Sequence, residues 1–126
     1  IKSIPKAQRL QAMMSGNYDM VVTGWQSIFA DAYNFLDVWI SNSSYNTSGY
    51  KDAKLDQLLS ETETKYGNEP QKRWTMLQDA EKILMKDQGT LPLYQANNLE
   101  LLRSSVKGVS FNPNGTPYDF KTAYIQ

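Results

Sequence analysis

Two stretches in the middle of the chain place apolar residues three and four positions apart, which is the spacing of an amphipathic helix. The first stretch is preceded by Asp52, a residue type that caps helices, and is broken by Gly67-Asn68. Its apolar face consists of Leu55, Leu58, Leu59, Thr62 and Tyr66. The second stretch begins near Glu69-Pro70 and stops at Gly89, and its apolar face consists of Trp74, Leu77, Ala80, Ile83 and Leu84. Together they predict an antiparallel helical hairpin.

Shorter patterns precede this hairpin. Pro5, apolar residues at helical spacing and then Gly16 predict a short helix. The nearly continuous apolar run from Tyr18 to Thr23 predicts a strand that is covered on both faces, and a helix leading directly into a strand indicates an α/β layer. A further short helix is predicted for the aromatic-rich cluster of Tyr33, Phe35, Leu36, Val38, Trp39 and Ile40.

The last third of the chain alternates short apolar runs with turn signals. Strand-like runs are predicted at 91–94 and 99–102, and Val106 to Val109 is predicted to be a short strand or turn. The sequence from Asn112 to Gly115 is a strong turn signal. It is followed by a tail with spaced apolar anchors at Tyr118, Phe120, Tyr124 and Ile125.

Composition excludes several classes of function. Thirteen basic and thirteen acidic side chains leave no net charge, so a nucleic-acid partner is not expected. The sequence contains neither Cys nor His, which removes disulfides, thiolate or imidazole metal sites and His-dependent nucleophiles. No metal or other cofactor is therefore expected. No apolar run approaches the ~20 residues of a membrane helix, and the start at Ile1 suggests a processed or excised segment.

The most informative local feature is Gly24-Trp25 at the end of the predicted strand. Gly allows close approach of the backbone, and an indole offers a large apolar surface with one N–H donor, so the pair can form the wall of a ligand cleft. An indole that simply fills the core is an equally good reading of this feature by itself.

The order of these pieces resembles the C-terminal part of bacterial oligopeptide-binding proteins, the family 5 solute-binding receptors of ABC peptide importers. The resemblance covers nearly the whole chain, although each motif is weak by itself. It rests on the helix ending at Gly16, Tyr18-Asp19-Met20, Gly24-Trp25, Phe35-Leu36-Asp37, Asn46 to Tyr50, the helical hairpin, Leu91-Pro92-Leu93-Tyr94, Val106-Lys107-Gly108 and Tyr124-Ile125.

The resemblance implies a piece of a two-lobed, periplasmic-binding-protein-like fold. Residues 1–103 would be the second half of the C-terminal, ligand-binding lobe, and residues 104–126 would be closing strands that return to the N-terminal lobe. The implied partners are an oligopeptide and the permease subunits of an ABC transporter. The implied location is extracytoplasmic, in the periplasm or on the outer face of the membrane, with a lipid anchor outside this segment.

The resemblance also implies a binding site directly after the Gly-Trp pair. Trp25 would form a pocket wall, Gln26 and Ser27 would make polar contacts, and Ile28 and Phe29 would add apolar lining. The position of Asp31 also matches the pattern of the family.

Two positions depart from the family pattern. Ala32 stands where Pro is usual, and Ile28 stands where the family often has an Asp that pairs with the ligand's amino terminus. A buried ammonium without its partner costs roughly 3–5 kcal/mol, so we expect this amino terminus to be held differently. Either it protrudes into water, or Asp31 or another acid binds it.

Two other classes of function compete with a transport receptor. A carboxylate-based, glycosidase-like enzyme would need two acids close together in one pocket, and the spacing brings no such pair together. Its candidate acids are Asp19, Asp31, Asp37 and Glu61, beside the aromatic residues Trp25, Tyr33 and Trp39. A structural or interaction module would use the Trp and Tyr content at a protein interface. We expect a binding protein and no enzyme.

Overall fold

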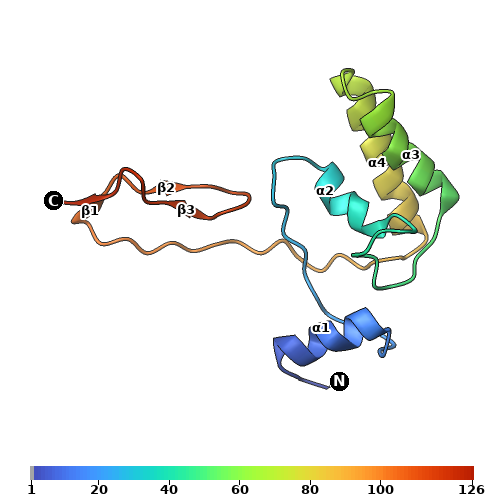
Figure 1. Cartoon of the computed structure of the whole chain (residues 1–126), viewed down its shortest axis with the longest axis horizontal. Helices are drawn as coiled ribbons and strands as arrows, with labels where there is room; N and C mark the ends of the chain where they lie inside the picture. Colours follow the sequence, from blue (N-terminus) through green and yellow to red (C-terminus); the bar gives the residue numbers. More distant parts are fainter. Residues whose placement is uncertain (1) are drawn as a thin grey trace.

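The computed structural model describes residues 2–126, so Ile1, the first residue of the predicted range 1–103, lies outside the described residues. Helices come first along the chain and short strands last (Figure 1). The helices are α1 (Lys6–Ser15), α2 (Tyr33–Leu36), the 3₁₀ helix η1 (Asp37–Trp39), α3 (Ala53–Thr64) and α4 (Pro70–Lys86). The strands are β1 (Val106–Lys107), β2 (Ser110–Phe111), β3 (Tyr118–Asp119) and β4 (Tyr124–Ile125).

The core lies between α2, α3 and α4, which together with η1 we call the helical body. Its fully or nearly buried side chains are Leu36, Leu55, Leu59, Leu77, Ala80 and Leu84. Burying one such leucine contributes about 1.5–3 kcal/mol, so this cluster is the main apolar stabilisation of the chain. The predicted helical hairpin is confirmed as α3 and α4, although Trp74 of its predicted apolar face is half exposed.

The helix ends follow the predicted signals. The Asp52 carboxylate accepts a hydrogen bond from the backbone N–H of Leu55 at 2.7 Å and so caps α3, while Pro70 opens α4. The helix α1 ends at Gly16, which has a φ of 70°. The predicted short helix in the aromatic cluster is confirmed as α2 and η1. Within residues 2–126, none of the helices combines the length and apolar character needed to cross a bilayer.

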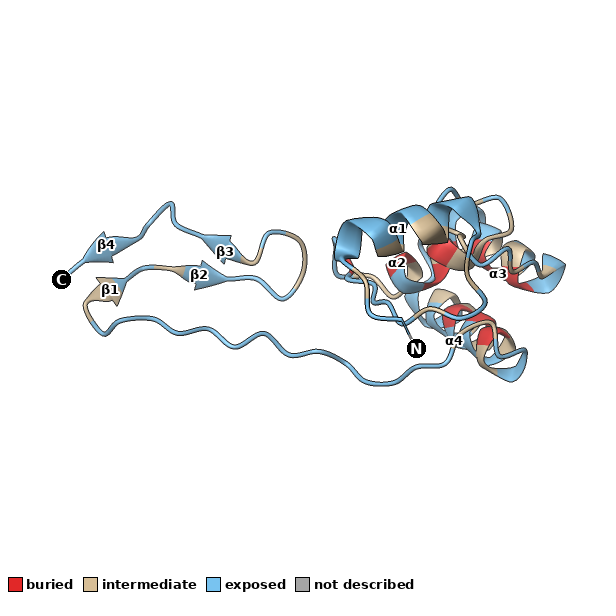
Figure 2. Cartoon of the chain, turned by 90° about the horizontal axis from the view of Figure 1, so that it is seen from below, coloured by how far each residue is buried: buried red, intermediate tan, exposed pale blue. Residues whose placement is uncertain are grey.

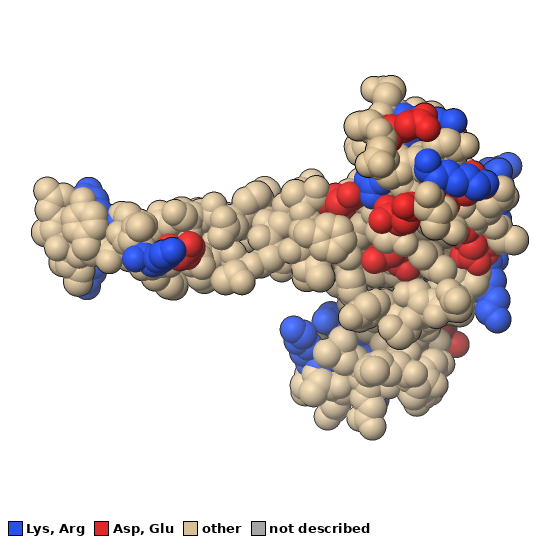
Figure 3. Space-filling view, turned by 45° about the horizontal axis from the view of Figure 1, so that its top comes forward, with Lys and Arg blue, Asp and Glu red and all other residues tan. Residues whose placement is uncertain are grey.

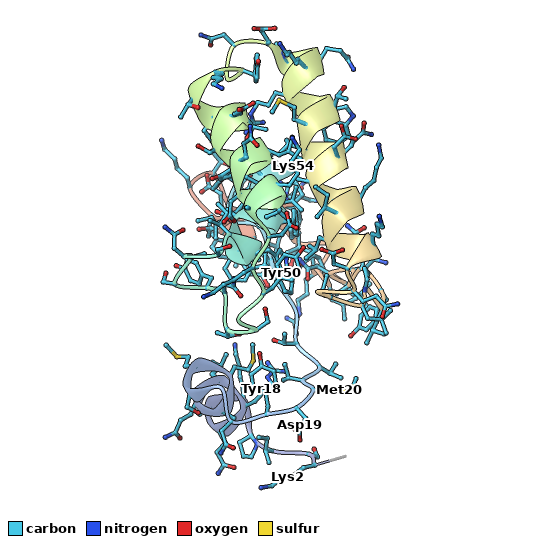
Figure 4. All side chains as sticks on the ribbon, turned by 90° about the vertical axis from the view of Figure 1, so that its right-hand side faces the viewer. Lys2, Tyr18, Asp19, Met20, Tyr50 and Lys54 are labelled. Atoms are coloured by element: carbon cyan, nitrogen blue, oxygen red, sulfur yellow. The ribbon has the colours of Figure 1, made fainter. Side chains whose placement is uncertain are left out.

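The strand predicted from Tyr18 to Thr23 is wrong. This run is irregular and extended, and Met20 and Val22 are 90% and 71% exposed. A strand needs a neighbour to accept and donate its main-chain hydrogen bonds, and among the described residues no backbone–backbone bond involves 18–26. The Tyr18 hydroxyl instead donates to the carbonyl of Thr47 at 2.8 Å. Figure 4 shows Tyr18, Asp19 and Met20 beside α1, below the part that carries Tyr50 and Lys54.

The strands predicted at 91–94 and 99–102 are also wrong, because both runs lie in one long, exposed and unpaired segment. The expected short strand at Val106 is confirmed as β1, and the turn between Asn112 and Gly115 joins β2 to β3. In what we call the β arm, residues 106–125, β1 pairs antiparallel with β4 and β2 with β3. Figures 1 and 2 show that the β2–β3 turn points toward the helices and that both chain ends of the arm point away.

Charged side chains gather over the helices, and the β arm carries few of them (Figure 3). The arm and the extended segment before it instead expose large apolar side chains. These are Leu91, Leu93, Tyr94, Leu99, Leu101, Leu102, Phe111, Tyr118, Phe120, Tyr124 and Ile125. The helices and the segment from Leu91 onward therefore differ in surface chemistry as well as in secondary structure.

Candidate functional site

Trp25 lies at the surface with one edge held in place. Its indole N–H donates to the backbone carbonyl of Asn34 at 2.7 Å, and its ring meets Tyr45 edge to face with the centroids 5.2 Å apart. The side chain remains 42% exposed. The indole is therefore oriented by the protein and leaves part of its aromatic surface exposed.

Among the residues that follow Trp25, Ser27 is buried while its neighbours Gln26, Ile28 and Phe29 are exposed. Ser27 is 2% exposed, and its hydroxyl lies within hydrogen-bond distance of the Phe29 carbonyl and of the Asn34 amide oxygen. Ile28 and Phe29 are 70% and 46% exposed. The buried serine fixes the backbone of this turn, so that two apolar side chains are presented together at the surface.

Asp31 is bound on two sides. Its Oδ1 accepts the backbone N–H of Tyr33 at 2.9 Å, at the start of α2, and the Arg73 guanidinium contacts both carboxylate oxygens at 3.1 and 3.0 Å. Arg73 also reaches Glu63 at 2.6 Å, and hydrogen bonds first to Glu63 and then to Asp31 raise the pKa of Arg73. Asp31 therefore connects the turn after Trp25 to α3 and α4.

Gln26 lines a small hollow between three segments that are distant in sequence. The hollow has a volume of about 330 Å³, and its other lining residues are Asn97, Asn98, Leu99, Glu100, Gly115, Pro117 and Tyr118. Most of these side chains are polar, and Glu100 is the charged one among them. The size is at the lower end of that of small-ligand pockets, and it fits polar groups of a ligand better than a large apolar one.

The β2–β3 turn approaches this site through Gly115. Its N–H donates to the carbonyl of Ser27 at 3.5 Å, and a Cβ at Gly115 would lie 3.0 Å from the carbonyl oxygen of Ile28. The φ of Gly115 is also 72°, a conformation that side chains disfavour. Glycine is thus required where the arm meets the candidate site.

The six predicted site residues form one continuous turn at the surface, and the structure adds partners that the pattern did not indicate. These are Asn34 below the turn, Arg73 on α4, and the polar run 97–100. Asn34 is a polar residue inside an apolar cluster, and that signal could have drawn attention to it. Arg73 and 97–100 are brought close only by the fold.

Two further features carry no candidate chemistry. A more open hollow of about 440 Å³ lies at the start of α4, lined by Glu69, Pro70, Gln71, Lys72, Thr75 and Met76, and contains none of the predicted residues. Across residues 2–126, no group of three acidic side chains is arranged to hold a metal ion.

The chain is similar to curated peptide-binding proteins, to one of them over its whole length. It is 31% identical over 127 residues to a dipeptide-binding protein of Lactococcus lactis, and the alignment covers 100% of this chain and 23% of that protein. It is 33% identical over 99 residues to the periplasmic oligopeptide-binding protein OppA of Escherichia coli, and this alignment covers 79% of this chain and 18% of OppA. The chain thus spans less than a quarter of the length of these relatives. No protein-family model matches it.

Solved structures show the same likeness in three dimensions. The substrate-binding domain of an oligopeptide ABC transporter from Bacillus anthracis superimposes with a TM-score of 0.87 at 31% identity, covering 99% of this chain and 24% of that one. The peptide-binding pheromone receptor PrgZ superimposes with a TM-score of 0.85 at 30% identity, covering 99% of this chain and 23% of that one. The helical body and the β arm therefore correspond to a part of such a substrate-binding domain.

Proposed function

On the premise that the homologues of this chain are oligopeptide- and dipeptide-binding proteins and that the chain matches the C-terminal part of a family 5 solute-binding protein, we propose that the chain belongs to a peptide receptor. This receptor captures oligopeptides outside the cytoplasm and delivers them to an ABC importer. The permease subunits of that importer would be its protein partners. A lipid anchor outside this segment would keep the receptor at the membrane.

One observation supports this proposal most directly. The backbone from residue 20 to residue 26 lies outside helices and strands and makes no backbone–backbone hydrogen bond within residues 2–126, and the exposed indole of Trp25 lies near its end. The Val22 carbonyl accepts a hydrogen bond from the Arg9 side chain, and the other main-chain groups are open to a partner strand. An extended peptide can pair with such a segment as an added strand, which gives affinity through the main chain whatever the side chains of the peptide are. The hollow beside Gln26 can accept further polar groups of the peptide.

We assign the predicted site residues the following roles. Trp25 forms the wall, Gln26 contacts polar groups from the hollow, and Ile28 and Phe29 line the apolar side. Ser27, which is buried, and Asp31, which is bound to Arg73, hold the turn in shape.

The same premise gives a proposal for the domain organisation. Residues 1–103 belong to the second half of the ligand-binding lobe, and residues 104–126 are strands that return to the other lobe. The apolar side chains exposed on the β arm support this assignment, because a patch of this kind usually marks a surface that another part of the protein covers. Closure of two lobes around a peptide would create the form that the transporter recognises.

Calorimetry on the whole gene product that carries this chain tests the function. We expect binding of unrelated peptides of several lengths, and a loss of about tenfold in affinity for Trp25→Ala, or ~1.4 kcal/mol. Trp74→Ala is a matched control, because Trp74 is half exposed on α4 and outside the site. Absence of binding for every peptide, or an equal loss in both variants, would contradict the proposal.

Glu100 is our candidate for the acid that holds the amino terminus of the peptide, since Ile28 carries no charge and both oxygens of Asp31 contact Arg73. Acetylation of the peptide should then weaken binding to the wild-type receptor by about tenfold, a typical cost for a hydrogen bond to a charged group. In Glu100→Gln the free and acetylated peptides should bind alike. If acetylation weakens binding to Glu100→Gln as much as it weakens binding to the wild type, Glu100 does not hold the amino terminus.

The carboxylate enzyme has little support. Asp31 is bound to Arg73, and Glu61 is bound to Lys65 and Gln57 on the surface of α3. The relatives named above are binding proteins and not enzymes by their names. The interaction module differs from our proposal in one expectation, because its exposed aromatic residues would bind a folded protein whether or not a peptide is present.

A further inference from the structure

Asn34 lies beneath the proposed binding wall and touches three of its residues. It is 4% exposed, in the first turn of α2. Its amide oxygen accepts the backbone N–H of Ile28 at 3.0 Å and lies 3.1 Å from the Ser27 hydroxyl. Its own backbone carbonyl accepts the indole N–H of Trp25 at 2.7 Å. One residue therefore fixes the ring of the wall and the backbone that follows it.

The orientation of the Asn34 amide is set from the other side. Its Nδ2 faces Oδ2 of Asp37 at 3.4 Å, so the oxygen of the same planar group must face Ser27 and Ile28. The second oxygen of Asp37, Oδ1, is buried and has no hydrogen-bond partner among residues 2–126. The carboxylate thus has free capacity to accept, and its negative charge selects the NH₂ end of the Asn34 amide.

We infer that Asn34 is a positioning residue of the peptide site, which acts through Trp25 and the turn at Ile28 without touching the ligand. This inference rests on the proposed function. The buried amide holds the turn at Ser27 and Ile28, while the backbone carbonyl of the same residue holds the indole of Trp25. With the turn fixed, the indole and the two apolar side chains keep one arrangement before a peptide arrives, and such preorganisation lowers the entropic cost of binding. Asn34 and Asp37 act as a pair, in which Asp37 orients the amide and the amide orients the turn.

Exchange of the two side chains gives a sharp test. Asn34→Ala removes the acceptor for Ile28 and should weaken peptide binding about tenfold. Asn34→Asp keeps an acceptor but places a second carboxylate against Asp37, so it should also weaken binding. The double variant Asn34→Asp with Asp37→Asn restores one acceptor and one donor at the same places and keeps the total charge. It should bind peptide within about twofold of the wild type.

The fluorescence of Trp25 supplies a readout that a merely stabilising residue would not move. This sequence has three tryptophans. In a whole gene product that carries Trp39→Phe, Trp74→Phe and a phenylalanine in place of every tryptophan outside this sequence, emission reports Trp25 alone. We expect a red shift and stronger iodide quenching in Asn34→Ala and recovery of both in the double variant. Asp52→Ala is the control, since it removes the cap of α3 and lowers stability at a place away from Trp25.

The outcomes separate the two proposals. If the wild-type gene product binds no peptide, the proposed function fails, while the emission series still decides whether Asn34 positions Trp25. If peptide binds and Asn34→Ala leaves both affinity and emission unchanged, the inference fails and the function stands. Loss of affinity in Asp52→Ala equal to that in Asn34→Ala would reduce Asn34 to a stabilising residue and overturn the inference.

Discussion

Arg73 shows how one side chain on a distant helix can shape the site. Its guanidinium contacts Asp31 in the turn after Trp25 and Glu63 on α3, and its side chain is 18% exposed. Partial burial weakens the competition from water, so these two bonds contribute more than a typical surface pair. The contacts of single residues thus link the candidate site to the helical body.

Substitution of Arg73 should therefore destabilise the protein and loosen the site together. We expect Arg73→Ala to lower the free energy of unfolding by about 1–3 kcal/mol, because Asp31 and Glu63 lose their common partner. Lys82→Ala on the same helix breaks an exposed pair with Asp79 and should cost less than about 1 kcal/mol. Urea unfolding of both variants checks the difference, and equal costs would show that Arg73 acts as an ordinary surface cation.

Tyr50 should make stability depend on pH in the alkaline range. Burial, followed by a hydrogen bond to Asp87, raises the pKa of Tyr50 from 10.0 to about 12. The folded state then holds the phenol proton more tightly than the unfolded state does, so this contribution is complete below pH 10.0 and is lost as pH rises through about 12. Urea titrations should show the wild type losing its advantage over Tyr50→Phe across this window, and a constant difference would refute the assignment.

Among the elements, the helices form through contacts within their own segments, whereas each strand forms only when another strand pairs with it. The cap at Asp52 and the apolar face of α3 act within a few residues, whereas β1 exists because β4 pairs with it from the end of the chain. Each strand of the β arm has two residues, so this pairing is short, and the residues that join β1 to β2 and β3 to β4 must keep both pairs in register. Gly108, directly after β1, is such a point.

Gly108→Ala should disrupt the β arm. A Cβ there would lie 2.1 Å from the backbone oxygen of Thr122, and the φ of Gly108 is 71°. Gly49→Ala is a matched control with a φ of 72° and nothing within 4 Å of its Cβ, so it carries only the backbone cost of roughly 1 kcal/mol. Hydrogen exchange at Lys107 and Tyr124 should accelerate in the first variant and stay unchanged in the second. Equal exchange in both would show that the arm tolerates the added methyl group.

The sequence could predict those elements whose determining signals lie within the element itself, and it could not predict features that depend on residues far along the chain. The helices α1, α3 and α4 follow from spacing, caps and glycine stops that all lie inside each segment. The run from Tyr18 to Thr23 has the composition of a strand, but whether it pairs depends on residues that its own pattern does not contain. The sequence singles out Trp25 as a candidate for a ligand wall, whereas Arg73 and Glu100 reach the candidate site only through the packing of α4 and the path of the extended segment.

At the scale of the whole molecule, the chain has one compact part and one open part. The helical body buries its leucines, while the extended segment and the β arm leave most of their large apolar side chains exposed. Exposed apolar surface of this extent usually serves as a contact surface. The proposed lobe boundary near residue 103 would therefore be a place where this chain meets the rest of the receptor.

The isolated chain should reveal this surface. We expect it to bind the dye ANS, to associate during gel filtration, and to bind peptides much more weakly than the whole gene product does, because it supplies one wall of the site. Restoration of the remaining receptor should abolish the association. A monomeric isolated chain that ignores ANS and binds peptide at micromolar concentration would contradict both the boundary and the one-walled site.

The contact between Gly115 and Ser27 also bears on the order of folding. It joins the β2–β3 turn to a residue that precedes the helical hairpin, so everything between Ser27 and Gly115 must be synthesised before it can form. Closing so long a loop is entropically costly and therefore slow, whereas the pairing of α3 with α4 needs only neighbouring residues. We expect α3 and α4 to acquire protection first during refolding, and the contact between Gly115 and Ser27 to form after them.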